Sequence, residues 1–253
     1  MTDSPHTPGP ATPDPRTITH RTYDAVHSTF DSHAMSVIYG EPGIGRTLLV
    51  HKALNTVAGH RVVDLTGHCS PRATLRSLRH ALLDQLPPLP RPYTSSRVDP
   101  LIIRHLTVAP HMIVCEEPGA YSGAGLKYLR WLWDCGHGHR PAVLLLSGPR
   151  IPQELQDSPH LRARIWSWYR IPPLPPGQTP LLLAGLHPLW RDVDPQLITY
   201  ADAHGLAGRL GLWQRFTSHL VTATEVFQTT AVTRRLIDWA LARTLTFPAA
   251  GLV

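Results

Sequence analysis

Apolar residues along the chain follow two alternating patterns. Five short runs are almost entirely apolar, and several of the segments between them carry an apolar residue at every third or fourth position. The short runs have the length of buried strands, whereas the spaced pattern is typical of a helix with one apolar face. The predicted strands are residues 36–39, 61–65, 111–115, 142–147 and 165–171.

The spaced pattern is clearest in two stretches. Leu75, Leu78, Leu82 and Leu86 form one apolar stripe, and Leu126, Leu129 and Trp133 form another. Strands that alternate with helices predict a parallel sheet with helices on both faces. We therefore expect an α/β fold.

Two proline-rich segments interrupt this alternation. Residues 87–92 are expected to be a stiff exposed connector, although they also fit a PxxP ligand. Residues 172–176 end the strand region, and only helical patterns follow, at 181–189, 195–204, 210–224 and 232–245. The sequence thus predicts a disordered tail over 1–18, an α/β domain over 19–172 and a small all-α domain over 173–253.

Composition places the chain among cytoplasmic proteins without a membrane segment. No apolar run is long enough to span a bilayer, and the first 15 residues lack the apolar core of a signal peptide. The three cysteines, Cys69, Cys115 and Cys135, are expected to be reduced thiols. Residues 135–139 read CGHGH, which favours a polar loop over a metal site because ligands this crowded rarely complete a tetrahedron.

The chain is basic, with a formal net charge of +6, and nearly all of its cations are arginines because Lys52 and Lys127 are the only lysines. This bias points first to genome-wide codon usage. It is compatible with nucleic-acid contact without establishing it.

The strongest motif is GEPGIGRT at residues 40–47, which follows the first strand and begins a helix. Glycines at these spacings let backbone amides turn toward an anion, and the helix N-terminus adds positive potential. The residues predicted to bind nucleotide are Gly40, Glu41, Pro42, Gly43, Ile44, Gly45, Arg46, Thr47 and Leu48. Thr47 would also hold Mg²⁺, and Arg46 stands where this motif has lysine.

Two carboxylates, Glu116 and Glu117, follow the buried strand at 111–115. Ligands of open α/β sheets bind at the carboxyl ends of the strands. Glu116 is the candidate magnesium-side acid, and Glu117 is the candidate base that polarises the attacking water. Without the phosphate loop upstream, a pair of solvated acids would be the better interpretation.

Two further residues are candidates for catalysis. Ser147 ends the fourth strand, where its hydroxyl could contact the γ-phosphate or the lytic water. In the segment Leu161-Arg162-Ala163-Arg164-Ile165, an arginine could reach a neighbouring subunit's nucleotide and stabilise transition-state charge. Arg164 is preferred over Arg162, and a plain surface role is equally compatible with the sequence.

Taken together, GEPGIGRT, MIVCEE, VLLLSG and LRARI occur in the order found in AAA+ ATPases. The chain resembles that family from about Ser36 to Leu245, and its helical tail resembles the family's lid. Within the tail, residues 210–216 and the last helix are most similar to transposition ATPases of the Mu B and TniB type, followed by helicase loaders. The departures are Arg46 in place of lysine, Glu116 in place of aspartate, and Pro118 and Gly119 after the acids.

The resemblance implies a P-loop sheet sandwiched by helices and followed by the lid, with ATP and Mg²⁺ as cofactors. It places Arg209 where the lid arginine senses nucleotide. It also implies nucleotide-dependent homo-oligomers on DNA that engage a transposase or integrase. The two departures at Arg46 and Glu116 are those expected of tight binding and slow hydrolysis.

Contact with DNA has its own candidate residues. Arg72, Arg76 and Arg79, with His80, share the face of a helix opposite its leucine stripe, and Arg234 and Arg235 are a second pair. A solvated helix face explains the first group slightly better. Two alternatives to an active ATPase therefore remain, namely a nucleotide-bound scaffold with little catalysis and a signalling NTPase module that does not bind DNA.

Overall fold

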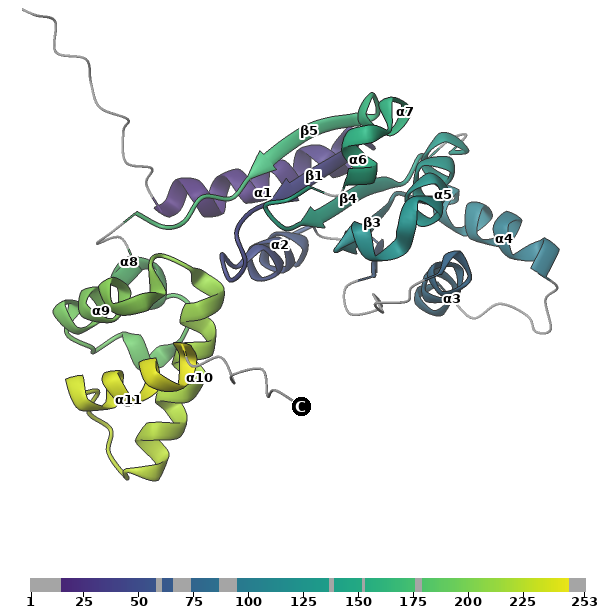
Figure 1. Cartoon of the computed structure of the whole chain (residues 1–253). Helices are drawn as coiled ribbons and strands as arrows, with labels where there is room; N and C mark the ends of the chain where they lie inside the picture. Colours follow the sequence, from purple (N-terminus) through teal and green to yellow (C-terminus); the bar gives the residue numbers. More distant parts are fainter. Residues whose placement is uncertain are drawn as a thin grey trace, which may run out of the picture. The chain divides into compact units, whose positions relative to one another are not determined.

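The computed structural model describes residues 15–57, 61–65, 74–86, 95–136, 139–151, 153–175 and 179–245 (Figure 1). These residues divide into two compact units. One unit comprises Arg21–Pro42 and Arg46–Pro172. The other comprises Pro173 onward, together with the described residues up to His20 and the three residues Gly43–Gly45.

The first unit is built on a parallel sheet of five strands in the order β2-β3-β4-β1-β5. This confirms both the parallel α/β fold and the position of every strand expected from the apolar runs. β3 and β4 are buried almost along their whole length, which is why their sequences lack the alternation of a half-exposed strand. The strands are β1 (Met35–Tyr39), β2 (Arg61–Asp64), β3 (His111–Glu116), β4 (Ala142–Ser147) and β5 (Ile165–Arg170).

The register brings the carboxyl ends of three strands to one edge of the sheet. Tyr39 at the end of β1 pairs with Ser147 at the end of β4, and Glu116 at the end of β3 pairs with Leu146. The segments that leave these strands therefore begin close together. This is the edge at which open α/β sheets bind ligands.

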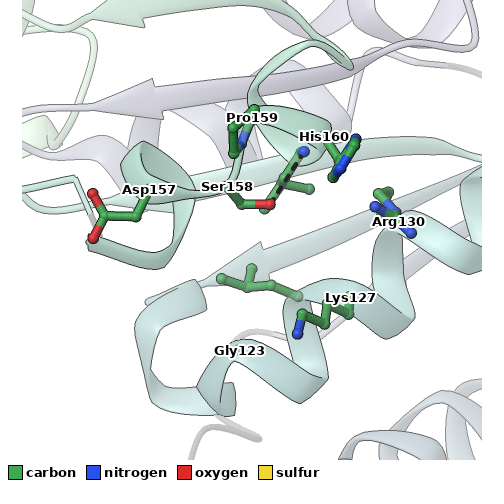
Figure 2. A pocket seen from close by; sticks show the side chains of 9 residues that line it. Gly123, Lys127, Arg130, Asp157, Ser158, Pro159 and His160 are labelled. Atoms are coloured by element: carbon green, nitrogen blue, oxygen red, sulfur yellow. Dashed lines mark hydrogen bonds between the residues drawn. The ribbon is translucent and has the colours of Figure 1, made fainter.

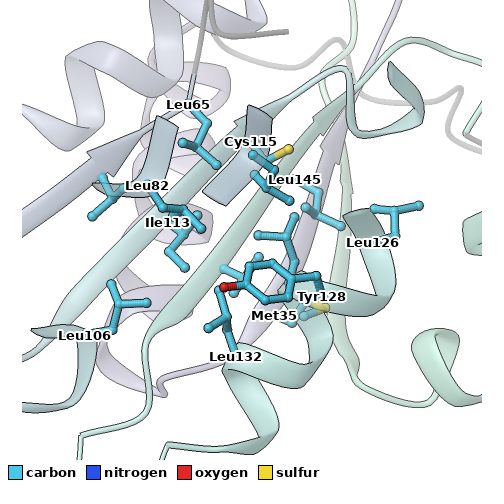
Figure 3. Packing of buried hydrophobic residues seen from close by; sticks show 14 of the residues in the cluster. Met35, Leu65, Leu82, Leu106, Ile113, Cys115, Leu126, Tyr128, Leu132 and Leu145 are labelled. Carbon is cyan, nitrogen blue, oxygen red and sulfur yellow. The ribbon is translucent and has the colours of Figure 1, made fainter. Parts of the chain in front are cut away.

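Helices cover both faces of this sheet. The larger core cluster joins alternate strand residues, such as Val37, Ile113 and Leu145, to apolar residues of α3 to α7 (Figure 3). The intervening strand residues, among them Ile38 and Leu144, are equally buried on the opposite face. The helices of this part of the chain are α1 (Pro15–Asp31), α2 (Arg46–Leu54), α3 (Leu75–Gln85), α4 (Ser95–Thr107), η1 (Pro118–Tyr121), α5 (Ser122–Asp134), α6 (Gln153–Asp157) and α7 (Pro159–Arg162).

Helix α1 was not expected from the apolar pattern. It begins at Pro15, so residues 15–18 of the tail predicted over 1–18 are helical, whereas residues 1–14 lie outside the described residues. Ile18, Val26 and Phe30 are buried on one side of α1. The positions between them on that side are the buried threonines Thr22 and Thr29, which interrupt the apolar stripe in the sequence and hide the helix.

A polar cluster joins α3, α4 and α5. Arg79 donates from Nε and Nη2 to the two carboxylate oxygens of Asp99, at 2.8 and 2.6 Å, and its guanidinium lies 4.9 Å from the ring centroid of Tyr128. The Tyr128 hydroxyl donates to Asp99 Oδ1 at 2.7 Å. The hydrogen bond with Asp99 raises the pKa of Arg79, and burial raises the pKa of Tyr128 well above its usual value.

The second unit is helical around the rings of Trp190, Trp213 and Phe216. Asp202 is buried there and accepts hydrogen bonds from the Gly208 amide and the Trp213 indole at 2.8 and 2.9 Å. None of the described helices in either unit is long and apolar enough to cross a membrane. The elements are α8 (Thr179–Leu183), η2 (Pro188–Trp190), α9 (Pro195–Ala201), η3 (Asp202–Leu206), α10 (Leu210–Val226) and α11 (Arg234–Leu245).

The helix predicted over 181–189 is wrong as a single element. α8 ends at Leu183, and a separate short turn of 3₁₀ helix begins at Pro188. Proline lacks the amide that a continuing helix needs at this point, and Gly185 further weakens helical continuity. The predictions at 195–204, 210–224 and 232–245 correspond to α9 with η3, to α10 and to α11, with ends shifted by two residues.

Candidate functional site

The loop between β1 and α2 has the shape that its glycines suggest. Gly43 and Gly45 have φ angles of 77° and 92°, in the region that residues with a side chain rarely adopt. The Gly40 amide donates to the Ser147 carbonyl at 3.3 Å, which attaches the start of the loop to β4. Ile44 is buried, Leu48 is half-buried, and Pro42 is exposed. The strand, turn and helix therefore follow one another as the sequence predicts.

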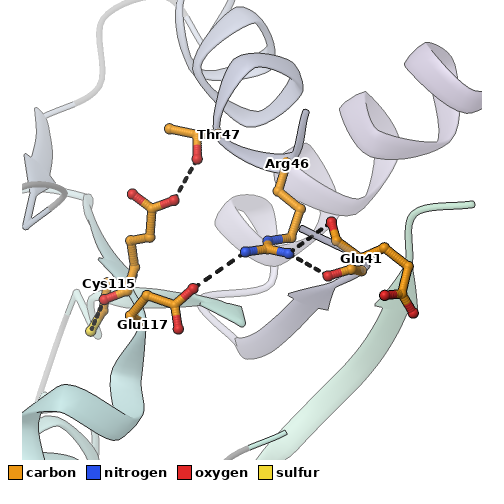
Figure 4. Close-up of polar contacts among 7 residues, drawn as sticks. Glu41, Arg46, Thr47, Cys115 and Glu117 are labelled. Atoms are coloured by element: carbon orange, nitrogen blue, oxygen red, sulfur yellow. Dashed lines mark hydrogen bonds and ion pairs between the residues drawn. The ribbon is translucent and has the colours of Figure 1, made fainter. Parts of the chain in front are cut away.

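Arg46, the first residue of α2, reaches back over the loop (Figure 4). Its Nη1 donates to the carbonyl oxygens of Gly40 and Glu41, the latter at 3.3 Å. Its Nη2 lies 3.3 Å from Glu117 Oε1, forming an ion pair. The planar guanidinium thus joins the loop backbone to the end of β3, a geometry that a lysine ammonium cannot reproduce.

Thr47 and Glu116 form a second contact between the same two segments. The Thr47 hydroxyl donates to Glu116 Oε1 (Figure 4). Because Thr47 lies in the first turn of α2 and Glu116 ends β3, the contact places a hydroxyl and a carboxylate oxygen side by side at the sheet edge. A hydroxyl and a carboxylate are both oxygen ligands that Mg²⁺ accepts.

Glu117 has an unusual backbone. Its φ is 48°, which is rare for a residue with a side chain, and Pro118 begins η1 immediately after it. The Glu117 amide donates to the Leu146 carbonyl at 2.8 Å, so β4 fixes the turn at this point. Such strained conformations persist only where the surrounding structure compensates for them, and they cluster at active sites and ligand-binding sites. The Glu117 side chain is 59 % exposed and directed to Arg46.

These residues fit a nucleotide with its magnesium ion. The Nε of Arg46 is buried and has no hydrogen-bond partner among the described residues, so it is a donor available beside the loop. Gly43 and Gly45 have the positive φ angles found in tight anion-binding turns, and Thr47 with Glu116 supplies a pair of oxygen ligands. The spacing of the motifs predicts that these residues lie together, whereas the contact between Arg46 and Glu117 has no signal in the sequence.

The remaining predicted site residues lie in different surroundings. Ser147 is buried at the end of β4, beside the start of the loop. Arg164 follows α7, where its Nε donates to Asp134 Oδ1 at 2.8 Å and its Nη1 donates to the His160 carbonyl at 2.8 Å. Arg209 is exposed at the residue before α10, in the helical unit. The structure thus brings Arg46, Thr47, Glu116 and Glu117 together, and it gives Arg164 a partner within its own chain.

Residues 29–155, half of the chain, match the family model described as AAA domain. The chain belongs to this AAA family. No curated protein matches the sequence. The match covers the phosphate loop and both acids at the end of β3. The resemblance to AAA+ ATPases is therefore confirmed at the level of the family, whereas the narrower assignment to the Mu B and TniB type remains a prediction.

Solved structures share the fold of this AAA protein at low sequence identity. The ORC2 protein of Aeropyrum pernix, solved as ADPNP–ADP complexes, has a TM-score of 0.70 and 14 % identity over 95 % of this chain and 71 % of its own. Cdc6p of Pyrobaculum aerophilum has a TM-score of 0.71 and 12 % identity over 96 % and 70 %. Aeropyrum pernix ORC1, solved in complex with DNA, has a TM-score of 0.64 and 14 % identity over 92 % and 66 %.

A separate pocket of about 410 Å³ lies between α5 and the α6–α7 segment of this AAA domain (Figure 2). Lys127 and Arg130 line it from α5, and Ser158 and His160 line it from the opposite side. The Ser158 hydroxyl caps α7 by accepting from the Leu161 amide. None of the residues predicted to bind nucleotide lines this pocket.

The helix proposed to follow DNA is α3, and the structure changes the assignment of its arginines. Arg79 is held by Asp99 and Tyr128, so its guanidinium is engaged within the domain. Arg76 and His80 are exposed, and Arg72 lies outside the described residues. The solvated-face interpretation therefore gains support over a continuous phosphate-binding row.

Proposed function

We propose that this protein binds ATP with Mg²⁺, assembles with nucleotide on DNA, and supports transposition or integration by engaging a transposase. The observation that carries the nucleotide part is the convergence of Arg46 and Thr47 with the paired acids Glu116 and Glu117. Membership of the AAA family and the fold shared with nucleotide-bound ORC2 support it.

Each residue of the site has a role in this proposal. The amides of residues 43–47 would hold the phosphates, and Arg46 would donate to them from its guanidinium. Thr47 and Glu116 would hold the metal, and Glu117 would orient the attacking water and accept its proton. When bound, ATP supplies the transferable phosphoryl group, and Mg²⁺ neutralises charge on its phosphates. Ser147 lies at the end of β4, where its hydroxyl would contact the γ-phosphate or the lytic water.

The contact between Arg46 and Glu117 favours slow turnover. A carboxylate that is paired with a guanidinium must leave its partner before it can orient water. This observation favours the second candidate function as well, in which a nucleotide-bound scaffold assembles on binding alone and catalysis is weak.

Assembly on DNA and engagement of a transposase are the finer parts of the proposal. The net charge of +6 suits a polyanionic partner, and the similar Aeropyrum pernix ORC1 was solved in complex with DNA. The resemblance of the helical unit to the Mu B and TniB lid suggests the transposase. Within a homo-oligomer, Arg164 would reach a neighbour's nucleotide after releasing Asp134, whereas Arg162 is already exposed. Arg209 would sense nucleotide from the lid.

The proposal is tested by measuring ATP binding, turnover and assembly with and without duplex DNA. We expect rings or filaments with ATP and DNA together, turnover that falls about 100-fold or more in Glu117→Gln, and loss of ATP binding in Arg46→Ala. Glu225→Gln, an exposed glutamate of the helical unit, is the matched control.

Three results separate the candidate functions. Assembly with ATP and unchanged turnover in Glu117→Gln would establish the scaffold and remove the catalytic assignment. ATP binding with no retention of DNA under any nucleotide condition would favour a signalling module. A protein that ignores ATP at every magnesium concentration would overturn the nucleotide site itself.

A further inference from the structure

Strand β5 presents an exposed aromatic face at the edge of the sheet. It lies last in the strand order, so β1 is its neighbour on one side and its other backbone edge faces away from the sheet. Its exposed side chains alternate: Trp166 is 56 % exposed, Trp168 is 39 % exposed, and Arg170 is exposed. Tryptophan is buried in most proteins, so two exposed indoles on alternate residues of one strand mark an interaction surface.

The pairing of β5 with β1 shows on which face of the sheet the exposed β5 side chains lie. Trp168 pairs with Val37 and Arg170 pairs with Tyr39. Paired residues of parallel strands point to the same side, and Val37 belongs to the core cluster beneath α3 to α7. Trp168 and Arg170 therefore continue that face beyond the buried core, whereas Trp166 lies at the irregularity in the pairing of β5 with β1, where it has no partner residue. Tyr169 points to the opposite side, where it hydrogen-bonds Thr22 of α1.

Two exposed arginines flank the tryptophans in the sequence, and the acid that acts on β5 is Asp24 of α1, close to Tyr169. Arg162, at the end of α7, and Arg170 are both exposed, and neither forms an ion pair with any described residue. β5 itself contains no acid. Arg164, between them, is instead neutralised by Asp134. We call Arg162, Trp166, Trp168 and Arg170 the β5 edge surface.

We infer that the β5 edge surface binds single-stranded nucleic acid, with bases stacked on Trp166 and Trp168 and phosphates on Arg162 and Arg170. Exposed indoles supply flat apolar area for bases, and the free arginines supply charge complementary to the backbone. Alternate strand residues are about 6.6 Å apart, so each ring can take a separate base. β5 itself contains no acid that could pair with an incoming cationic segment, which disfavours a basic protein partner.

The proposed contact between the β5 edge surface and the nucleic acid does not select a particular base. The β5 edge surface offers indole faces and guanidinium charges, and every base has a face that can stack. Binding is therefore expected to tolerate sequence and to weaken with salt. It uses none of the residues that converge at the phosphate loop, so it goes beyond the proposed function and does not depend on it.

The test is fluorescence anisotropy of labelled dT and rU oligonucleotides with the full chain, without ATP. We expect Trp166→Ala and Trp168→Ala each to weaken binding by about 5- to 150-fold, the range for the loss of one stacked base. Trp168→Phe should restore most of the affinity because the phenyl ring still stacks. Removing Arg170 should reduce the slope of log K against log salt by about 0.7. The two labelled strands distinguish DNA from RNA.

Control substitutions elsewhere in the chain test whether the loss of oligonucleotide binding is specific to the β5 edge surface. Trp131→Ala, on α5 and stacked on Tyr128, and Arg104→Ala, exposed on α4, should leave oligonucleotide binding unchanged. Arg46→Ala should lose ATP and keep the oligonucleotide, whereas the tryptophan variants should keep ATP.

Equal oligonucleotide affinity in the two tryptophan variants and the wild type would overturn the inference. So would a wild type that binds no oligonucleotide while Trp166→Ala or Trp168→Ala changes its sedimentation, because a second copy of the chain would then cover the surface. Binding of duplex alone, with no affinity for either single strand, would also overturn it.

Discussion

Arg46 and Glu117 neutralise each other at the phosphate loop. The Nη2 of Arg46 lies 3.3 Å from Glu117 Oε1, while Nη1 holds the carbonyls of Gly40 and Glu41. The only cation of the loop is thus bound to the carboxylate that we propose as the catalytic base. The same contact that brings the arginine's charge to the site also occupies the Glu117 carboxylate.

Arg46→Lys should accelerate ATP turnover. A lysine ammonium has no planar fork, so it cannot hold two carbonyls and Glu117 together, and the carboxylate is released. We expect turnover to rise by about tenfold, which corresponds to about 1.4 kcal/mol in the barrier, with little change in ATP affinity. Steady-state phosphate release at saturating ATP measures the rate.

The control for this prediction is the double variant Arg46→Lys with Glu117→Gln. It should lose the gain completely, because the gain depends on the freed carboxylate. If Arg46→Lys turns ATP over no faster than the natural protein, the ion pair does not limit catalysis.

Thr47→Ala should make ATP binding depend more strongly on magnesium. The Thr47 hydroxyl donates to Glu116, and its removal would delete one of the two proposed oxygen ligands of Mg²⁺ while leaving the loop backbone intact. The magnesium concentration for half-maximal binding of a fluorescent ATP analogue should rise about tenfold or more. Thr47→Ser keeps the hydroxyl and should behave like the wild type. Equal magnesium requirements in the alanine and serine variants would remove Thr47 from the metal site.

The sequence predicted the sheet well because its strands are buried on both faces. Runs such as 142–147 have no polar interruption, so their length and their flanking turns identify them. Helix α1 was missed because Thr22 and Thr29 occupy buried positions in its stripe. Helix α4 was missed as well, since Pro100 lies inside it and the proline-rich segment before it suggested a loop.

The sequence predicts which residues lie at the candidate site, but it does not predict the contacts between them. Spacing placed Arg46 and Thr47 in the loop and Glu116 and Glu117 after a strand, because strand ends meet at one sheet edge. Which acid meets which loop residue depends on the turn at Glu117, whose φ of 48° no residue type in the sequence signals. The pairing of Arg164 with Asp134 depends likewise on tertiary packing.

Asp99→Ala should destabilise the α/β unit. Asp99 accepts two hydrogen bonds from Arg79 and one from Tyr128, so its loss leaves a guanidinium and a buried hydroxyl without an acceptor. The side chains of the ion pair are about one third exposed, so solvent screening reduces its contribution to stability. We therefore expect a loss of about 1–2 kcal/mol in the free energy of unfolding. Urea denaturation measures it. Asp84→Ala, at an exposed position on α3, should change stability little.

The free energy of unfolding should fall at alkaline pH because Tyr128 ionises more readily in the unfolded chain than in the folded one. Burial, and then its hydrogen bond to Asp99, raises the pKa of Tyr128 above its ordinary value of 10.0. Because the folded state holds the proton more tightly than the unfolded chain, this contribution to stability is fully present below pH 10. It is lost as pH rises through the raised pKa of the folded state, at about 1.4 kcal/mol per pH unit at most.

The Tyr128 contribution is isolated by comparing the wild type with Tyr128→Phe in urea denaturation from pH 8 to pH 11. The variant loses the hydrogen bond to Asp99, so it should be less stable at pH 8. It has no proton to release, so the difference between the two proteins should narrow above pH 10. Burial also raises the pKa of Tyr169, and Tyr128→Phe with Tyr169→Phe should flatten the alkaline profile further. A constant difference across the whole range would show that Tyr128 does not ionise differently in the folded and unfolded chains.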